Sequence, residues 1–327
     1  MKSFMKWTAA AAVVQVCAAQ TYTDCNPTEK TCDPDTGLSS WTFTTDFTSG
    51  DFDGWNTTSG NVDITSQGAA FTINEQGDAP TIESEFYIFF GRVEVVMQSA
   101  NGTGIISTAI LESDDLDEID WEQISTFPTQ ITTNYFGKGN TTSYDRATSV
   151  SVSNPNTEFH TYTIDWTAEK TEWFVDGESV RTLNYADAVD GTNYPQTPMR
   201  VRIGIWAGGD PDNGQGTIEW AGGETDYTAA PFTMYVSSVS ITNYNPADSY
   251  TWTDMTGSYD SIEAANGTDT SDMNLGASSI SPSSSSATPA SSSPTPFFNA
   301  ATGVFPSSFE ALVVVCLAGL VTGWLQL

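Results

Sequence analysis

Alternation of apolar and polar residues recurs along this chain and limits the possible fold more than any other feature. It is clearest in FGRVEVVMQ (90–98), FHTYTIDW (159–166) and MRVRIGIW (199–206), and a period of two is typical of β-strands. In KTEWFVDGESVRTL, Asp176-Gly177 separates two such runs, as in a β-hairpin. No sustained 3.6-residue apolar stripe indicates a helix. The sequence therefore predicts an all-β, two-sheet antiparallel sandwich.

The composition is strongly acidic. Among the 327 residues, 10 are Lys or Arg and 41 are Asp or Glu, which gives a formal net charge of −31. Nucleic acids and anionic membranes attract basic surfaces, so this balance argues against either as a partner. Charged residues make up only 16% of the chain, and Ser, Thr, Gly and Asn are plentiful. We expect a secreted protein whose partner is uncharged.

The N-terminus has the order of a secretory signal peptide. Residues 1–19 begin with two lysines, continue with a short apolar run and end with small residues near Ala19, which is typical of a cleaved export signal. A buried N-terminal helix is the alternative. Export leads to an oxidising environment. Because the other two cysteines lie in ends expected to be removed, we expect Cys25 and Cys32 to form one disulfide loop.

The C-terminus has the order of a glycosylphosphatidylinositol (GPI) attachment signal. Residues 299–327 begin with small residues at Asn299, continue with a spacer and end in an almost wholly apolar run. The tail is expected to be removed after about Asn299. A plain tail-anchoring helix is the alternative, but no basic residue follows the apolar run to hold it in a membrane. Before it, residues 251–298 are expected to form a Ser/Thr-rich, glycosylated linker.

These assignments leave residues 20–250 as one folded domain. Its length is acceptable for a single β-sandwich. Exposed Asn-X-Ser/Thr sequences are acceptors for N-glycosylation in exported proteins, and four occur, at Asn56, Asn101, Asn140 and Asn266.

The stretch DEIDWE places four carboxylates within residues 117–122. If it is a strand, Glu118, Asp120 and Glu122 face one side, and the two apolar residues between them face the core. A solvated acidic loop is the alternative, but it does not explain why large apolar residues occupy the alternate positions. We therefore expect the three acids to share the exposed face of one sheet.

Carboxylates on one face suit the cleavage of glycosidic bonds. Retaining glycosidases use two carboxyl groups about 5–5.5 Å apart, one as nucleophile and one as proton donor. Strand residues four apart are separated by about 13 Å at Cα, so a pair formed by Glu118 and Glu122 requires a concave or distorted sheet. Asp120 between them would orient the nucleophile and separate the two pKa values.

Two other chemistries fit less well. A calcium site also uses clustered acids, but DEIDWE lacks the Gly and Asn pattern of a calcium loop, and we expect no metal. Histidine-based catalysis would depend on His160, the only histidine. Its parity with Tyr162 and Ile164 favours a buried position.

The motif Glu118-Ile119-Asp120-Trp121-Glu122 resembles the ExDxE signature of glycoside hydrolase family 16. CNPTEKTC, TNYFGKGNTTSYDR and IWAGGDPDNGQGTIEWAGGETDY resemble, in the same order, segments of its fungal Crh branch, the cell-wall transglycosylases that join chitin to β-glucan. The resemblance covers residues 22 to 245. It implies a concanavalin A-like jelly roll with a concave substrate cleft and no cofactor. It also implies Glu118 as nucleophile, Glu122 as general acid/base and Asp120 as helper.

Two features depart from that branch. The residues after Glu122 are more polar than its usual Gly-containing continuation, which bears on the acceptor side of the cleft. Two cysteines in the mature chain also leave no room for the cysteine-rich chitin-binding module of some relatives. Affinity for chitin would then come from the cleft itself.

Candidate substrate-binding residues follow from strand parity. In MRVRIGIW the residues opposite the core face include Arg202, a hydrogen-bond donor, and Trp206, a flat surface for a sugar ring. Thr217 of GTIEW is assigned to the outward face of a further strand. With Glu122, the remaining candidates are the NYFGKG residues Tyr135, Phe136 and Lys138. Ordinary core and surface positions are the alternative for each.

Three functions remain open. The resemblance favours a retaining transglycosylase that cleaves chitin and transfers the fragment to β-1,3/β-1,6-glucan or chitin acceptors in the fungal wall. It would act as a monomer at the cell surface, in contact with the membrane only through its lipid anchor. An endo-acting β-glycan hydrolase would use the same residues, and residue types cannot separate the two. A non-catalytic wall lectin is the third possibility, but it would not need three adjacent carboxylates.

Overall fold

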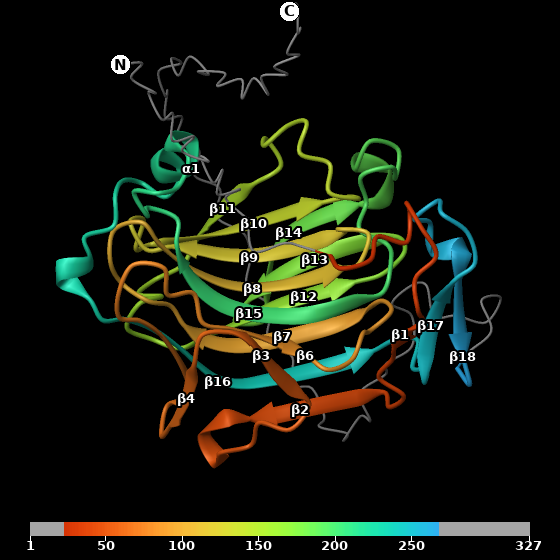
Figure 1. Cartoon of the computed structure of the whole chain (residues 1–327), viewed down its shortest axis with the longest axis horizontal. Coiled ribbons are helices and arrows are strands. Elements are labelled where there is room, and N and C mark those ends of the chain that lie inside the picture. Colours follow the sequence, from red (N-terminus) through yellow and green to blue (C-terminus); the bar gives the residue numbers. More distant parts are fainter. Residues whose placement is uncertain (1–22, 268–327) are drawn as a thin grey trace, which may run out of the picture. The chain divides into compact units, whose positions relative to one another are not determined.

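Two large antiparallel sheets make up most of residues 23–267, the part of the chain that this computed structural model describes (Figure 1). One sheet has seven strands, which are, in spatial order, β11 (Thr148–Ser151), β10 (Gln130–Phe136), β9 (Glu118–Ile124), β8 (Ile105–Ser113), β15 (Met199–Ala207), β6 (Thr81–Ser84) and β3 (Trp55–Ser59). The predicted two-sheet antiparallel sandwich is confirmed.

The second large sheet has eight strands. Its spatial order is β14 (Glu178–Asn184), β13 (Lys170–Val175), β12 (His160–Trp166), β7 (Gly91–Gln98), β16 (Phe232–Asn243), β5 (Gly68–Ile73) and β4 (Val62–Thr65), with β2 (Thr42–Asp46) also paired to β16. A small third sheet consists of β1 (Asp35–Thr36), β17 (Ser249–Trp252) and β18 (Ile262–Ala265). Short helices connect the strands: α1 (Gln215–Trp220) and the 3-10 turns η1 (Phe47–Ser49), η2 (Tyr185–Asp187), η3 (Tyr227–Ala229) and η4 (Tyr259–Ser261).

The core lies between the two large sheets because alternate residues of each strand point into it. Val201, Ile203 and Ile205 of β15 are all buried, as the alternation in MRVRIGIW predicts. Two tryptophans connect the sheets through their indole N–H groups. Trp121 of β9 donates to the carbonyl of Thr163 in β12 at 3.2 Å, and Trp173 of β13 donates to the carbonyl of Asp120 at 3.1 Å. Strand β9 is therefore held from its core side.

The predicted hairpin at Asp176-Gly177 is confirmed. Strands β13 and β14 pair in antiparallel register up to Val175 and Glu178. The two residues between them have φ angles of 52° and 84°, and positive φ at both positions is what a type I′ turn requires. Asp and Gly adopt these angles more readily than other residues.

The folded region extends further than the sequence predicts. Residues 251–265 were assigned to the linker, but β17 ends at Trp252 and β18 occupies Ile262–Ala265. Ile262 is buried, and the Trp252 indole donates to Asp35 of β1 at 3.1 Å. The segment between these strands is polar and rich in turn residues, so its sequence resembles a linker even though both its ends are packed.

The expected signal peptide, most of the expected linker and the expected anchor signal lie outside residues 23–267. Within that range no helix has the length and apolar character needed to cross a bilayer. The predicted disulfide between Cys25 and Cys32 is present, with the two Cα atoms 5.9 Å apart.

Candidate active site

The three acids of the ExDxE motif lie on one face of β9, as strand parity predicts. Ile119 and Trp121 between them are completely buried in the core. Asp120 is also buried, with 1% of its surface exposed, whereas Glu118 and Glu122 are partly exposed. The outer two carboxyl groups can therefore reach a ligand, and the middle one is covered by its neighbours.

The strands on both sides of β9 supply the walls around these acids. On β8, Glu112 is the register partner of Glu118, and Thr108 is the partner of Glu122. On β10, Phe136 pairs with Glu118 and Thr132 with Glu122. Register partners in a sheet point to the same face. The proposed reaction centre thus lies between an acidic and aromatic end at Glu118 and a hydroxyl-lined end at Glu122.

Burial gives all three carboxyl groups raised pKa values. It raises the pKa of Glu118 to about 8 and that of Glu122 to about 7. Burial and the charges of Glu118 and Glu122 raise the pKa of Asp120 well above its usual range. A side-chain hydrogen bond from Asp120 acts in the opposite direction on Glu118 and lowers its pKa. A protonated Asp120 that donates a hydrogen bond to Glu118 would favour the ionised form of Glu118.

Arg202 lies on the predicted face of β15, but its side chain is buried among acidic side chains. It forms an ion pair with Glu112, and its Nε lies 3.7 Å from a carboxylate oxygen of Glu83. Its side chain is only 8% exposed. The positive charge of Arg202 lowers the pKa of Glu118. In this structure Arg202 balances the acids beside the nucleophile candidate.

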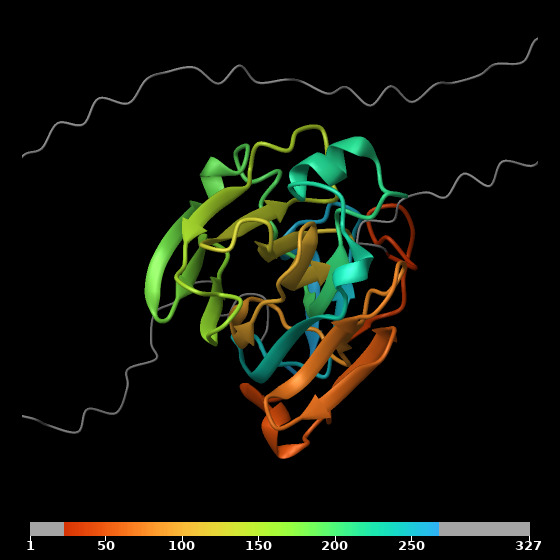
Figure 2. The same ribbon diagram turned by 90° about the vertical axis from the view of Figure 1, so that its left-hand side faces the viewer.

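Trp206 lies on the predicted face and is stacked against a second tryptophan, Trp220 of α1. Their ring centroids are 6.0 Å apart and their planes differ by 22°. Trp220 borders a hollow of about 220 Å³. The other residues that line it are Ile124, Phe127, Gln130, Thr132, Ala147 and Ser149. Since Thr132 is the register partner of Glu122, this hollow adjoins the Glu122 end of the site. Figure 2 shows α1 and the loop between β10 and β11 on the same side of the molecule.

Two candidate residues require correction. Thr217 lies in helix α1 and not on a strand, and the buried Ile218 and Ala221 are spaced for one side of a helix. GTIEW is too short for its sequence to distinguish the helical period of 3.6 residues from the strand period of two. Tyr135 pairs with Ile119 and belongs to the buried core. It therefore faces away from the acids, and the guanidinium of Arg181 lies 5.5 Å from its ring centroid.

The other two NYFGKG candidates have different positions. Phe136 is partly exposed on the face of the acids, where its ring contacts Tyr144 at a centroid distance of 6.4 Å. Tyr144 is 76% exposed and was not singled out from the sequence. Lys138 lies beyond the end of β10, and its Nζ is 3.6 Å from a carboxylate oxygen of Asp117. Lys138 therefore lies in the loop after β10, against the turn before β9, and not on the face of the sheet.

The remaining candidates lie away from the acids. His160 is on β12 of the other sheet, where its ring nitrogens contact the Asp176 carboxylate and the Ser153 carbonyl. Among the glycosylation acceptors, Asn56 and Asn101 are exposed. The side-chain nitrogens of Asn140 and Asn266 already donate hydrogen bonds, to Asn193 and Asp248 respectively. Within residues 23–267, no cluster of three or more His, Cys, Asp and Glu side chains is arranged to hold a metal.

The chain is similar in sequence and fold to proteins of a known family. The family model for glycosyl hydrolases family 16 matches residues 50–222. Crh-like protein 1 of Aspergillus fumigatus is 64% identical over 260 residues, which cover 80% of this chain and 71% of that protein. A solved structure described as Crh5 transglycosylase in complex with NAG has 60% identity and a TM-score of 0.73, covering 73% of this chain and 99% of that one.

More distant structures support the fold alone. A Bacillus licheniformis β-glucanase has 24% identity and a TM-score of 0.53, with coverage of 62% of this chain and 99% of that chain. Together with the antiparallel sheets, these similarities confirm the predicted jelly-roll sandwich.

Proposed function

Because the chain belongs to glycosyl hydrolase family 16 and, within it, to the Crh cell-wall transglycosylases, we propose that it cleaves chitin and transfers the fragment to β-glucan or chitin acceptors. The observation that carries this proposal is the arrangement of β9, which presents two partly exposed glutamates with a buried aspartate between them. The resemblance of the flanking strands and loops to that branch supports the substrate class.

In the first step, the Glu118 carboxylate attacks the anomeric carbon of the chitin chain. Glu122 donates its proton to the oxygen of the bond that breaks, so the leaving chain departs as a neutral alcohol. A covalent ester between the sugar and Glu118 results. Burial raises the pKa values of both glutamates, so these values do not separate the two roles. The resemblance to the family assigns Glu122 as the acid, and the reaction starts from the form in which Glu118 is ionised and Glu122 carries its proton.

In the second step, the ionised Glu122 accepts a proton from a hydroxyl group of the acceptor sugar. That oxygen attacks the anomeric carbon and displaces Glu118, which restores both carboxyl groups to their starting state. Two inversions at one carbon give net retention. Asp120 lies between the two glutamates on the same face of β9, and a hydrogen bond from its protonated form would stabilise the charge on Glu118 each time it forms.

Transfer in place of hydrolysis requires an acceptor sugar to compete with water at Glu122. The hollow beside Glu122 supports this requirement because Trp220, Ile124 and Phe127 contribute apolar walls to it. A pyranose ring stacked on an aromatic surface would displace water from the place where a hydrolytic water would otherwise attack. Trp206 extends the aromatic surface behind Trp220.

Product analysis tests the proposal. Purified protein is incubated with a chito-oligosaccharide donor and a fluorescent β-glucan or chitin oligosaccharide acceptor. We expect fluorescent products longer than the acceptor, and none from the Glu118→Gln variant, which keeps side-chain volume but loses the nucleophile. A matched control is Glu94→Gln, since Glu94 lies on β7 of the other sheet and pairs with Arg92. Release of shortened donor without labelled product would instead support the hydrolase alternative, and no turnover would support a lectin.

We also propose that the protein is exported, glycosylated at some of its four acceptors and held at the cell surface by a GPI anchor. The signal at residues 1–19 and the order of small, spacer and apolar residues after Asn299 support this location. A chain that ends at residue 298 is expected in the culture fluid with its transfer activity intact. Equal retention of that chain on cells would contradict the anchor.

A further inference from the structure

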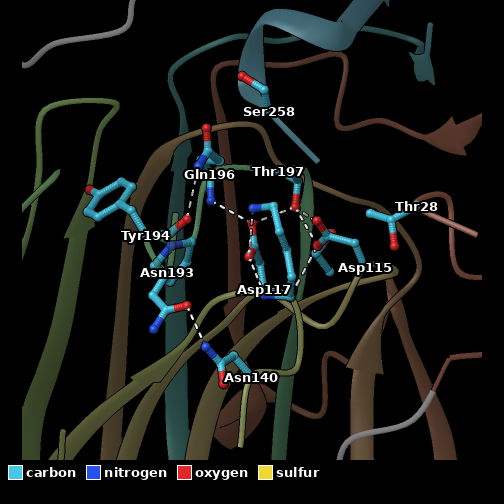
Figure 3. A network of polar contacts seen from close by, with 12 residues as sticks. Thr28, Asp115, Asp117, Asn140, Asn193, Tyr194, Gln196, Thr197 and Ser258 are labelled. Atoms are coloured by element: carbon cyan, nitrogen blue, oxygen red, sulfur yellow. Dashed lines mark hydrogen bonds and ion pairs between the residues drawn. The ribbon is translucent and has the colours of Figure 1, made fainter. Parts of the chain in front are cut away.

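The turn before Glu118 contains a completely buried acid, Asp117, that the proposed chemistry does not use. Its two carboxylate oxygens lie within hydrogen-bond distance of three donor groups (Figure 3). The Lys138 backbone N–H donates to Oδ1 at 2.9 Å, and the Gln196 backbone N–H donates to Oδ2 at 2.7 Å. The Thr197 hydroxyl also lies 2.9 Å from Oδ2. A carboxylate that accepts this many bonds while buried is a fixed junction in the structure.

The groups bound to Asp117 come from separate segments of the chain. Lys138 follows β10, whereas Gln196 and Thr197 precede β15. Glu118, the first residue of β9, is paired with Phe136, which lies two residues before Lys138. The Asp117 carboxylate therefore connects the start of β9 to the end of β10 directly beside the nucleophile candidate.

The turn itself needs such a constraint. Leu116 has a φ angle of 64°, in the left-handed region that costs a non-glycine residue about 1–2 kcal/mol. Such a conformation persists where the surroundings hold it in place. The carbonyl of Leu116 accepts a hydrogen bond from Gly139 N–H at 2.8 Å, and the backbone N–H of Asp117 donates to Asp115 at 3.1 Å. The turn is thus held from both the β10 side and within itself.

A second buried acid, Asp115, completes the arrangement. The single Thr197 hydroxyl lies 2.8 Å from Asp115 and 2.9 Å from Asp117, and it can donate its proton to only one of them. Burial, followed by the charge of Asp117, raises the pKa of Asp115 to about 8. Burial also raises the pKa of Asp117, and the charge of Lys138, whose Nζ lies 3.6 Å from Asp117, acts in the opposite direction. The two buried acids thus share one hydroxyl and one nearby positive charge.

We propose that Asp117 is a positioning residue that holds the turn before β9 and thereby keeps Glu118 aligned for attack on the anomeric carbon. The proposal rests on the proposed role of Glu118 as nucleophile. Asp117 does not face the sugar. Its loss should therefore slow the chemical step and leave substrate binding nearly unchanged, because small displacements of a reacting group can cost about a hundredfold in rate.

The Asp117→Asn variant tests this role. It keeps the side-chain volume but turns one acceptor oxygen into an N–H donor that faces other donors. We expect kcat for transfer to fall about tenfold or more, with KM for the donor changed by less than about threefold. Asp165→Asn is the matched control, since Asp165 accepts hydrogen bonds from Arg92 and Tyr244 in the other sheet. A folded Asp117→Asn variant with the kcat of this control would overturn the proposal.

A second pair of variants covers the case in which Asp117→Asn does not fold. Thr197→Val removes only the hydroxyl, whereas Thr197→Ser keeps it, so kcat should be lower for valine than for serine. Equal kcat values would contradict the proposal.

Amide hydrogen exchange at Lys138 and Gln196 supplies a readout without substrate. Exchange should be faster in Asp117→Asn than in the wild type, and unchanged exchange would show that Asp117 does not hold these segments. A wild-type protein without turnover would contradict the proposed function, whereas an active wild type with an unaffected Asp117 variant contradicts the positioning role alone.

Discussion

Asp120 shows how one buried side chain can serve two partly exposed ones. It lies between Glu118 and Glu122 on the same face of β9, and the charges of both raise its pKa. A neutral Asp120 can donate a hydrogen bond, and a donor beside Glu118 favours the ionised nucleophile. If Glu118 is the nucleophile, we expect the proton held by Asp120 to matter more than its negative charge.

This reasoning predicts the behaviour of substitutions at position 120. Asparagine is close in shape to a protonated aspartate and also donates a hydrogen bond, so Asp120→Asn should retain measurable transfer, about tenfold to a hundredfold below the wild type. Glu118→Gln and Glu122→Gln should be less active than Asp120→Asn, because each removes a group that reacts. Steady-state rates with one donor and acceptor pair give the order, and an Asp120→Asn variant as inactive as Glu118→Gln would contradict it.

Single residues also mark the limit of sequence reasoning. Parity along β9 predicted which side chains face the core, and Ile119 and Trp121 are there. NYFGKG carries no alternation that separates Tyr135 from Phe136, whereas the register of Tyr135 with Ile119 puts Tyr135 on the core side. The partner of Trp206 could not be predicted, since Trp220 reaches it from a helix in a distant segment.

Strands and turns that are marked by alternation or by typical turn residues could be predicted from the sequence. Elements whose position depends on contacts with distant segments could not. Strands β9 and β15 alternate along most of their length, and the β13–β14 hairpin has the turn residues that its angles demand. Helix α1 is six residues long, too short to show a period. The position of β18 depends on pairing with β17, which no local pattern reveals.

Strand parity leads to a comparison between two tryptophans. Trp206 points from β15 toward the cleft face, whereas Trp121 points from β9 into the core. Trp206→Ala should weaken oligosaccharide binding by about 0.5–1.5 kcal/mol beyond lost area and change the melting temperature little. Trp121→Ala should destabilise the fold by about 3–5 kcal/mol. Calorimetry measures the change in binding, and thermal unfolding measures the change in stability. A large loss of stability in Trp206→Ala with unchanged binding would mean that Trp206 faces the core.

The molecule as a whole collects an unusual number of buried acids. Burial raises the pKa values of Asp115 and Glu118 to about 8, and that of Glu122 to about 7. In the unfolded chain the same groups lose their protons near pH 4. The folded protein therefore binds more protons than the unfolded chain between about pH 4 and pH 8.

The predicted consequence is a stability that decreases as pH rises. The contribution of these acids is complete below about pH 4 and is lost as pH rises through their folded pKa values. Exposed acids such as Asp46 and Asp226 have lowered pKa values. The stability that they contribute is lost as pH falls, but only below about pH 4. Thermal unfolding from pH 4 to pH 8 should show a falling melting temperature. A melting temperature that rises across this window would contradict the protonated state of the buried acids.

Trapping the glycosyl-enzyme most directly tests the claim that Glu118 is the nucleophile of a retaining enzyme. The Glu122→Gln variant is mixed with a chito-oligosaccharide that carries an activated leaving group, which departs without a proton donor. Without its general base the variant should release the sugar slowly, so the intermediate accumulates. Mass spectrometry of the digested protein is expected to find the added sugar on the peptide containing Glu118, attached at that residue. Attachment at another carboxylate, or no covalent sugar while donor is still turned over, would contradict the mechanism.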